Sequence, residues 1–159
     1  MTTNLFRIGA MALGLIAAQR ILPAKDNHSV EGVWDVNVTV TNCQTGALIR
    51  TVESLQMFSQ DGSVNETANT FLRGSSVGVW AHSGADKYQV KFWFFRYKPD
   101  GTFASRAQAL DNIVLSDDGK TFSASGNIKD FDASGALLST GCFVHAATRL
   151  TPSAQGDDE

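Results

Sequence analysis

The chain lacks the residue patterns that several common functions require. It has no glycine-rich phosphate loop, no Cys-x-x-Cys pair and no serine in a nucleophile-elbow context. Its three histidines, His28, His82 and His145, lie too far apart in sequence to predict a metal site. The 13 basic residues are scattered and the formal net charge is −3, unlike the clustered charge of nucleic-acid-binding proteins. We therefore expect no metal, no cofactor and no nucleic-acid partner.

Long hydrophobic runs are also missing, and the apolar run near the N-terminus is short. It extends from Ile8 to Ala18, where Gln19 and Arg20 end it, whereas about 20 residues are needed to span a bilayer. This pattern predicts a signal peptide over residues 1–18, with cleavage after Ala24 as the alternative, and a secreted or periplasmic protein without a stable membrane span. The other open alternative is that this segment is retained as a helix that anchors the protein to a membrane or binds a partner.

Seven compact turn signals, each containing glycine, aspartate or serine, divide residues 32–150 into eight short segments. No helix-length apolar pattern lies between them, so the predicted fold class is all-β. Eight antiparallel strands in sequence order, closed by pairing the first with the last, make an up-and-down β-barrel whose lumen can hold one small ligand. The expected strands are 33–41, 50–59, 64–72, 77–82, 87–97, 102–116, 120–131 and 136–150.

The length of 159 residues and the hydrophobic content of 43% suit one domain with one core. We expect this barrel domain to occupy residues 32–151. Residues 19–31 are predicted to form a linker, and residues 152–159 a disordered acidic tail.

Closure of the barrel can be tested on the sequence. Along two antiparallel strands, the residue numbers of facing residues add up to nearly the same value. The pair Trp34 and Arg149 and the pair Cys43 and Cys142 agree in this sum to within two residues. Both cysteines then fall on the outer face, where a disulfide would fasten the seam between the first and last strands. The alternative is two free buried thiols.

Two short motifs carry a resemblance to a known superfamily. Gly32-Val33-Trp34 opens the first strand and Arg149 stands near the end of the last, a pattern that resembles the calycins and, within them, the lipocalins. The resemblance implies that Trp34 closes one end of the barrel and that the basic side chain of Arg149 packs over its ring. It also implies a barrel that binds a small molecule.

Alternation along the strands predicts which side chains face the lumen. We expect a small, largely apolar ligand to contact a mainly aromatic and aliphatic lining. The predicted ligand-binding residues are Val36, Val38, Val40, Trp80, Phe92, Phe94, Phe122, Ile128, Phe143 and His145, and Glu66 and Leu72 are also expected to face inward. The alternative is a structural or assembly protein whose lumen is filled by its own side chains.

A second alternative is an enzyme, and whether the protein is one stays open. His145 could act as a general acid or base, ligate a haem iron, or simply be a buried structural residue. A cofactor-independent isomerase or cyclase, similar to the allene oxide cyclase type of barrel, would need a further polar group. The catalytic candidates are then His145, Glu66 and Arg106, with Glu53, His82 and Tyr97 as further possibilities by residue type.

The segment 87–97 is apolar on both of its faces, because four aromatic residues follow one another from Phe92 to Phe95. Its outer face needs a cover, and a homo-oligomer interface is one candidate.

Overall fold

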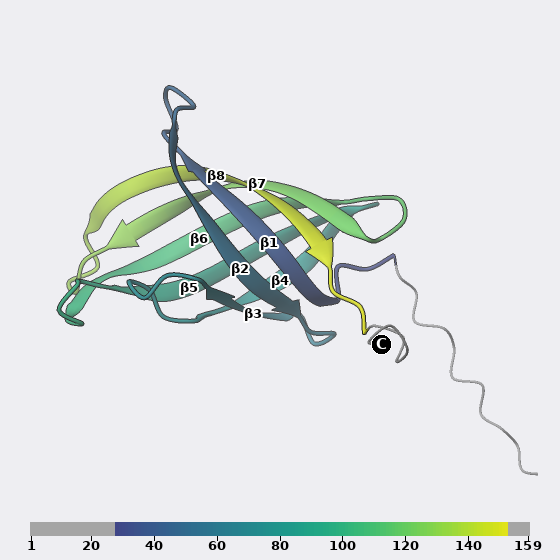
Figure 1. The fold of residues 1–159 in the computed structure, drawn as a ribbon, viewed down its shortest axis with the longest axis horizontal. Helices are drawn as coiled ribbons and strands as arrows, with labels where there is room; N and C mark the ends of the chain where they lie inside the picture. The colour runs from purple at the N-terminus through teal and green to yellow at the C-terminus, as the bar shows by residue number, and fades with distance from the viewer. Residues whose placement is uncertain (1–27, 153–159) are drawn as a thin grey trace, which may run out of the picture.

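The computed structural model describes residues 28–152 and shows a closed barrel of eight antiparallel strands (Figure 1). Neighbours in space are neighbours in sequence, and β8 returns to pair with β1. The predicted all-β barrel is therefore confirmed, while the expected signal peptide and most of the acidic tail lie outside the described residues. The strands are β1 Gly32–Thr41, β2 Leu48–Phe58, β3 Ser63–Ala68, β4 Ser76–Gly84, β5 Lys87–Tyr97, β6 Phe103–Leu115, β7 Thr121–Phe131 and β8 Leu137–Arg149.

Aspartates in four of the connections fix the turns locally. The Asp61 carboxylate accepts a hydrogen bond from the backbone N–H of Ser63 at 2.9 Å, and Asp100 does the same for Thr102 at 2.9 Å. Asp118 and Asp132 repeat this arrangement in the β6–β7 and β7–β8 connections. An aspartate that bonds its own backbone two residues later favours a turn over a continued strand. These turns hold the strands in the order that the sequence predicts.

One predicted strand is shorter than expected. β3 ends at Ala68 rather than near residue 72, and residues 69–75 form a loop. The loop lies along the end of β5, because Gly74 N–H donates to Phe95 O at 2.9 Å and Tyr97 N–H donates to Leu72 O at 2.8 Å. Leu72 thus lies in a loop instead of on a strand facing the lumen. Two backbone hydrogen bonds fix this loop at the rim of the barrel.

The seam between β1 and β8 closes the barrel in the register expected from the sequence. Trp34 is the direct partner of Arg149, and Thr41 is the partner of Cys142. Just beyond β1, Cys43 forms a disulfide with Cys142, with a Cα–Cα distance of 5.0 Å. Figure 1 shows β1 and β8 side by side along this seam.

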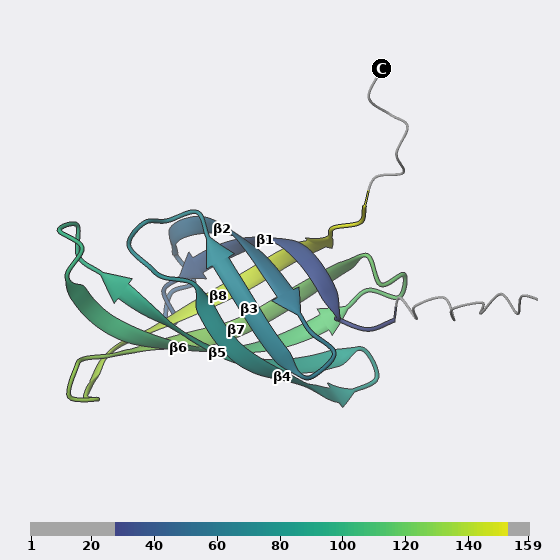
Figure 2. The ribbon, with the colours of Figure 1, turned by 90° about the horizontal axis from the view of Figure 1, so that it is seen from below.

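The connections alternate between the two ends of the barrel. In Figure 2 the β5–β6 and β7–β8 hairpins and the 69–75 loop lie toward one end, and the β4–β5 and β6–β7 turns toward the other. The second end also receives residues 28–31, which precede β1. We call this the closed end and the first the open end.

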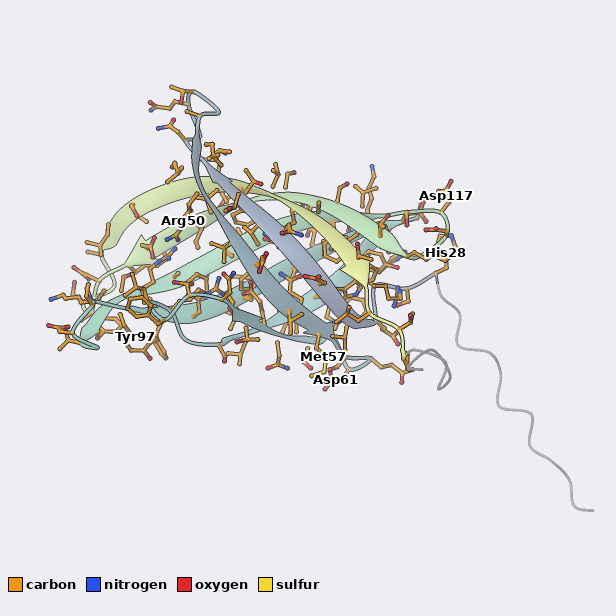
Figure 3. All side chains as sticks on the ribbon, in the orientation of Figure 1. His28, Arg50, Met57, Asp61, Tyr97 and Asp117 are labelled. Carbon is orange, nitrogen blue, oxygen red and sulfur yellow. A yellow bond between two sulfur atoms is a disulfide. The ribbon has the colours of Figure 1, made fainter. Side chains whose placement is uncertain are left out.

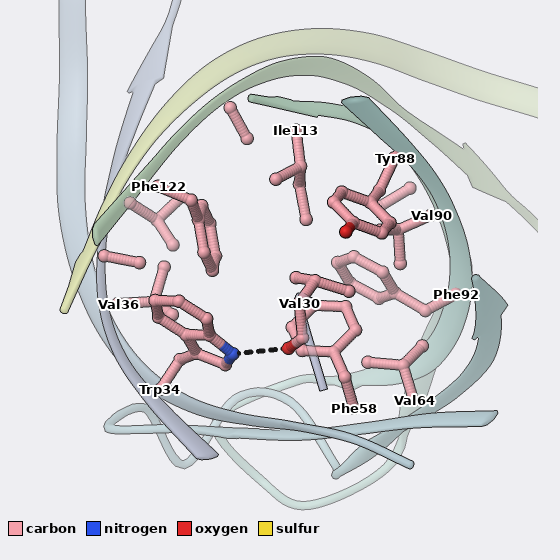
Figure 4. Packing of buried hydrophobic residues seen from close by; sticks show 14 of the residues in the cluster. Val30, Trp34, Val36, Phe58, Val64, Tyr88, Val90, Phe92, Ile113 and Phe122 are labelled. Carbon is pink, nitrogen blue, oxygen red and sulfur yellow. Dashed lines mark hydrogen bonds between the residues drawn. The ribbon is translucent and has the colours of Figure 1, made fainter. Parts of the chain in front are cut away.

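The closed end is filled by side chains. Trp34 is fully buried, and its indole Nε1 donates to the carbonyl oxygen of Val30 at 2.8 Å (Figure 4). Val30 is itself fully buried, and Phe122 packs edge-on against Trp34 with ring centroids 4.8 Å apart. Residues 28–31, which the sequence assigned to a linker, therefore belong to the folded domain. Apolar burial of Val30 explains the difference.

Glycine is required where β7 passes β8. A Cβ on Gly126 would lie 2.1 Å from the Leu110 carbonyl oxygen and 2.7 Å from the ring of Phe143. Phe143 is the partner of Gly126 in the β7–β8 ladder, so its ring covers the place where a side chain would otherwise be. The absent side chain thus leaves room for an aromatic ring inside the lumen.

Candidate functional site

A cavity lies in the open half of the barrel, away from Trp34. Its volume is ≈ 50 Å³, counted as the space open to the centre of a water molecule. This space holds a few waters or the reactive group of a small molecule. Apolar side chains form most of the wall, namely Val38, Val40, Val52, Phe92, Phe94, Ala109, Ile128 and Phe143. Polar and charged side chains complete it, namely Arg50, Glu66, Thr70, Arg73, Arg96 and His145.

The predicted ligand-binding residues divide between this cavity and the filled end. Those that line the cavity are Val38, Val40, Phe92, Phe94, Ile128, Phe143 and His145. Val36 and Phe122 are buried in the core around Trp34. Trp80 also lies there, donating its Nε1–H to Ser59 O at 3.0 Å and packing edge-on against Tyr88. The open half is thus the part of the lumen with room for a ligand.

The lumen contains a buried ion pair that includes one predicted residue. The Glu66 carboxylate, on β3, faces inward and pairs with the Arg73 guanidinium from the 69–75 loop. Ser76 connects them, because Arg73 Nη2 donates to Ser76 Oγ at 2.5 Å and Ser76 Oγ donates to Glu66 Oε2 at 2.6 Å. Burial lowers the pKa of Arg73, and the adjacent Glu66 opposes that change. The pair is a fixed, charged element in a lumen that we expected to be mainly apolar.

A second polar pair connects β6 and β8. Asp111 Oδ2 lies 3.4 Å from His145 Nδ1, both side chains are buried, and neither of these atoms forms a hydrogen bond. Burial, with a smaller contribution from Glu66, raises the pKa of Asp111 well above its usual range. Burial also lowers the pKa of His145 from 6.5 to about 4. Near neutral pH the imidazole is therefore uncharged, and burial favours the protonated form of the carboxyl group beside it.

Stacking fixes the imidazole of this pair in the lumen. The ring of Phe143 lies parallel to that of His145, with centroids 4.7 Å apart and an interplanar angle of 18°. Both residues are on the inward face of β8, two positions apart. The same strand therefore supplies an apolar wall and the base beside it.

The other catalytic candidates taken from the sequence do not meet in the lumen. Arg106 is exposed on the outer face of β6, and Glu53 is exposed on β2, where Asn69 Nδ2 donates to its Oε2 at 3.1 Å. His82 is exposed near the β4–β5 turn, its ring 5.0 Å from that of Tyr88. Tyr97 packs near Gly74 at the rim. These residues were candidates by residue type alone. Alternation along β6 turns Arg106 outward, and alternation along β2 turns Glu53 outward.

Sequence reasoning missed Asp111 and six of the residues that line the cavity, namely Arg50, Val52, Thr70, Arg73, Arg96 and Ala109. Asp111 stands in an alternating inward series on β6 with Ala107, Ala109 and Ile113, so strand parity could have placed it in the lumen. Arg73 stands in a turn segment, where parity does not apply. Its side chain reaches the lumen only because the 69–75 loop is attached to β5.

Within residues 28–152, no helix is long and apolar enough to cross a membrane. A scan of known protein families found no matching model. Among solved structures, the chain is similar to the S-type phycobiliprotein lyase CPES from Guillardia theta. That match has 15% sequence identity and a TM-score of 0.40, and it covers 77% of this chain and 89% of that one. The closed eight-stranded barrel and the packing of the Arg149 guanidinium over the Trp34 ring, both expected from the sequence, are present.

Proposed function

We propose that this protein is an exported, lipocalin-like barrel that binds a small, largely apolar molecule at the open end of its lumen. The observation that carries the proposal is the division of the lumen into a filled half around Trp34 and a hollow half between Phe92, Phe94 and Phe143. A barrel built only for stability would gain free energy by filling both halves. The hollow half instead combines an apolar wall with a few polar groups, as ligand sites do.

Two features support export. The N-terminal residues have the pattern of a secretory signal peptide. The disulfide between Cys43 and Cys142 is of a kind that persists in oxidising compartments. Together they favour a secreted or periplasmic protein.

Native mass spectrometry of the protein purified from its own source tests binding directly. We expect a retained small molecule with a mass that is lost on denaturation. A Val40→Phe variant, which places a ring in the cavity, should lose that mass. The matched control is Val144→Phe, because Val144 is 49% exposed on the outer face of β8. Equal retention by both variants would contradict a lumen site.

A second candidate function is favoured by the pair of Asp111 and His145. A buried carboxyl group whose pKa is raised and an uncharged imidazole, 3.4 Å apart, have the chemistry of an acid and a base that need no cofactor. The reaction class is then isomerisation or cyclisation of the bound molecule. If the protein is such an enzyme, His145→Gln should abolish turnover of the molecule identified by mass spectrometry and leave its binding intact. Turnover unchanged in this variant would exclude the role.

The outer face of β5 supports the proposal that the protein forms a homo-oligomer. Phe95 is 52% exposed and packs edge-on against Phe103, with ring centroids 6.1 Å apart. Lys91 Nζ lies 5.1 Å from the ring centroid of the neighbouring outward residue Trp93. A Phe95→Glu variant should dissociate the oligomer in analytical ultracentrifugation if this face is the contact.

A further inference from the structure

Three arginine side chains gather at the open end of the lumen. Arg50 near the start of β2, Arg73 in the 69–75 loop and Arg96 near the end of β5 all line the cavity. The guanidinium carbons of Arg73 and Arg96 lie 3.6 Å and 5.0 Å from the centroid of the Phe94 ring. Figure 3 shows Arg50 and Tyr97 on the side of the barrel away from His28 and Asp117. The cavity mouth is therefore the positively charged part of the lumen.

The carboxylates at this mouth do not balance the arginines. Glu66 pairs with Arg73, and Asp130 accepts a hydrogen bond from Arg96 Nε at 2.6 Å. Arg50 forms no ion pair within residues 28–152. Burial and the like charge of Arg96 lower the pKa of Arg50, and the charge of Asp130 opposes this change. One positive charge is left in excess.

A buried donor at the same place also lacks a partner. The Arg73 side chain is 10% exposed, and its Nε–H is buried without a hydrogen bond. An unpartnered buried donor on a charged group is unfavourable, because it has lost its hydrogen bonds to water. A ligand oxygen in the cavity would remove that cost. An anion in the cavity would satisfy both the unpaired donor and the excess positive charge.

We propose that the ligand of this lumen is a small apolar carboxylic acid, bound as its anion. The carboxylate lies at the mouth against Arg50, with Arg73 and Arg96 beside it, and the apolar body contacts Phe92 and Phe143 in the cavity wall. Guanidinium groups suit this head because their planar N–H donors match the two oxygens of a carboxylate. A single negative charge cancels the excess at the mouth. This inference rests on the proposed function, since it names the ligand class of the same cavity.

Benzoate and benzamide test the proposal, because they have nearly the same shape and differ in charge. Titrations of the oxidised barrel followed by NMR should show benzoate binding at least about tenfold more tightly than benzamide, as expected for a charge-assisted hydrogen bond. Added salt should weaken benzoate binding and leave benzamide binding unchanged. The shifted resonances should include those of Phe92 and Phe143.

Arg50→Gln removes the excess charge without leaving a buried carboxylate unpaired. This variant should bind benzoate no more tightly than benzamide, with its affinity for benzamide unchanged. Arg106→Gln on the outer face of β6 is the matched control and should behave as the unaltered protein. Equal affinity for the two compounds in the unaltered protein would overturn the anion proposal and leave the lumen site standing. Failure of both compounds to bind would overturn the lumen site as well.

Discussion

The guanidinium of Arg149 lies over the indole ring of Trp34, its central carbon 4.2 Å from the ring centroid. Its N–H groups also reach three carbonyl oxygens. Nε donates to Gly119 O at 2.7 Å, Nη2 to Ser29 O at 2.5 Å and Nη1 to Glu31 O. One side chain therefore joins β8, the β6–β7 turn and the segment before β1. The closed end depends on this junction because it fastens the segment before β1 to two segments from the C-terminal part of the chain.

Replacing Arg149 by lysine should lower the free energy of unfolding by about 1–3 kcal/mol, because one ammonium group cannot reach all three carbonyls. Urea denaturation followed by tryptophan fluorescence measures the change. Arg106→Lys, at an exposed position, should change stability by less than about 0.5 kcal/mol. Equal effects of the two substitutions would show that the junction contributes nothing.

The disulfide should be the largest single contribution to stability at the seam. Cys43 and Cys142 are 99 residues apart in sequence, and cross-linking a loop of about 100 residues contributes about 4–5 kcal/mol in the chain-entropy account. The double variant Cys43→Ser, Cys142→Ser should lose most of that amount in urea denaturation. Adding a reductant should destabilise the unaltered protein to the same level and leave the variant unaffected. A reductant effect on the variant would point to another cause.

Gly126→Ala should be strongly destabilising, by about 1–3 kcal/mol or more, because a new methyl group would overlap the Leu110 carbonyl and the Phe143 ring. Gly141→Ala is the control, since its Cβ would meet only the Ile128 side chain, at 3.2 Å. Thermal unfolding should separate the two variants clearly. Similar melting temperatures would mean that β7 and β8 can move apart at no cost.

Local chemistry explains why the sequence predicts the barrel well. Turn residues such as Asp61 and Asp100 act within two or three positions, and strand alternation acts on the same scale. Closure could also be predicted, because one register places both Trp34 with Arg149 and Cys43 near Cys142. The placement of Val30 is different. It depends on a hole at the end of the barrel that exists only after the strands have closed.

The site was less accessible to sequence reasoning for the same reason. The inward positions of His145 and Glu66 could be predicted from alternation along their strands, and both side chains are buried in the lumen. Arg73 enters through a loop whose path is set by hydrogen bonds to β5, which no local pattern encodes. The pairing of Asp111 with His145 joins two strands that lie on either side of β7, so the pattern within one strand does not predict it.

The pH dependence of stability should report the pair of Asp111 and His145. Because the pKa of His145 falls from 6.5 to about 4 on folding, the unfolded chain binds a proton that the folded one does not between these values. The contribution of His145 to stability should therefore decrease as the pH falls from 6.5 to 4, by up to about 1.4 kcal/mol per pH unit. Urea denaturation at a series of pH values measures it as the difference in stability between the unaltered protein and His145→Gln, which should change with pH over this range.

Asp111 should act in the opposite direction. Burial raises its pKa, so above pH 3.8 the unfolded chain releases a proton that the folded one retains, and stability decreases as the pH rises. Asp111→Asn is uncharged in both states and should make the protein more stable at pH 8, with little gain at pH 4. Asp35→Asn, at an exposed position on β1, is the control and should have no such effect. A less stable Asp111→Asn variant at pH 8 would show that the carboxyl group contributes to the fold. A more stable variant that no longer converts the bound molecule would instead identify Asp111 as a group that function retains against stability.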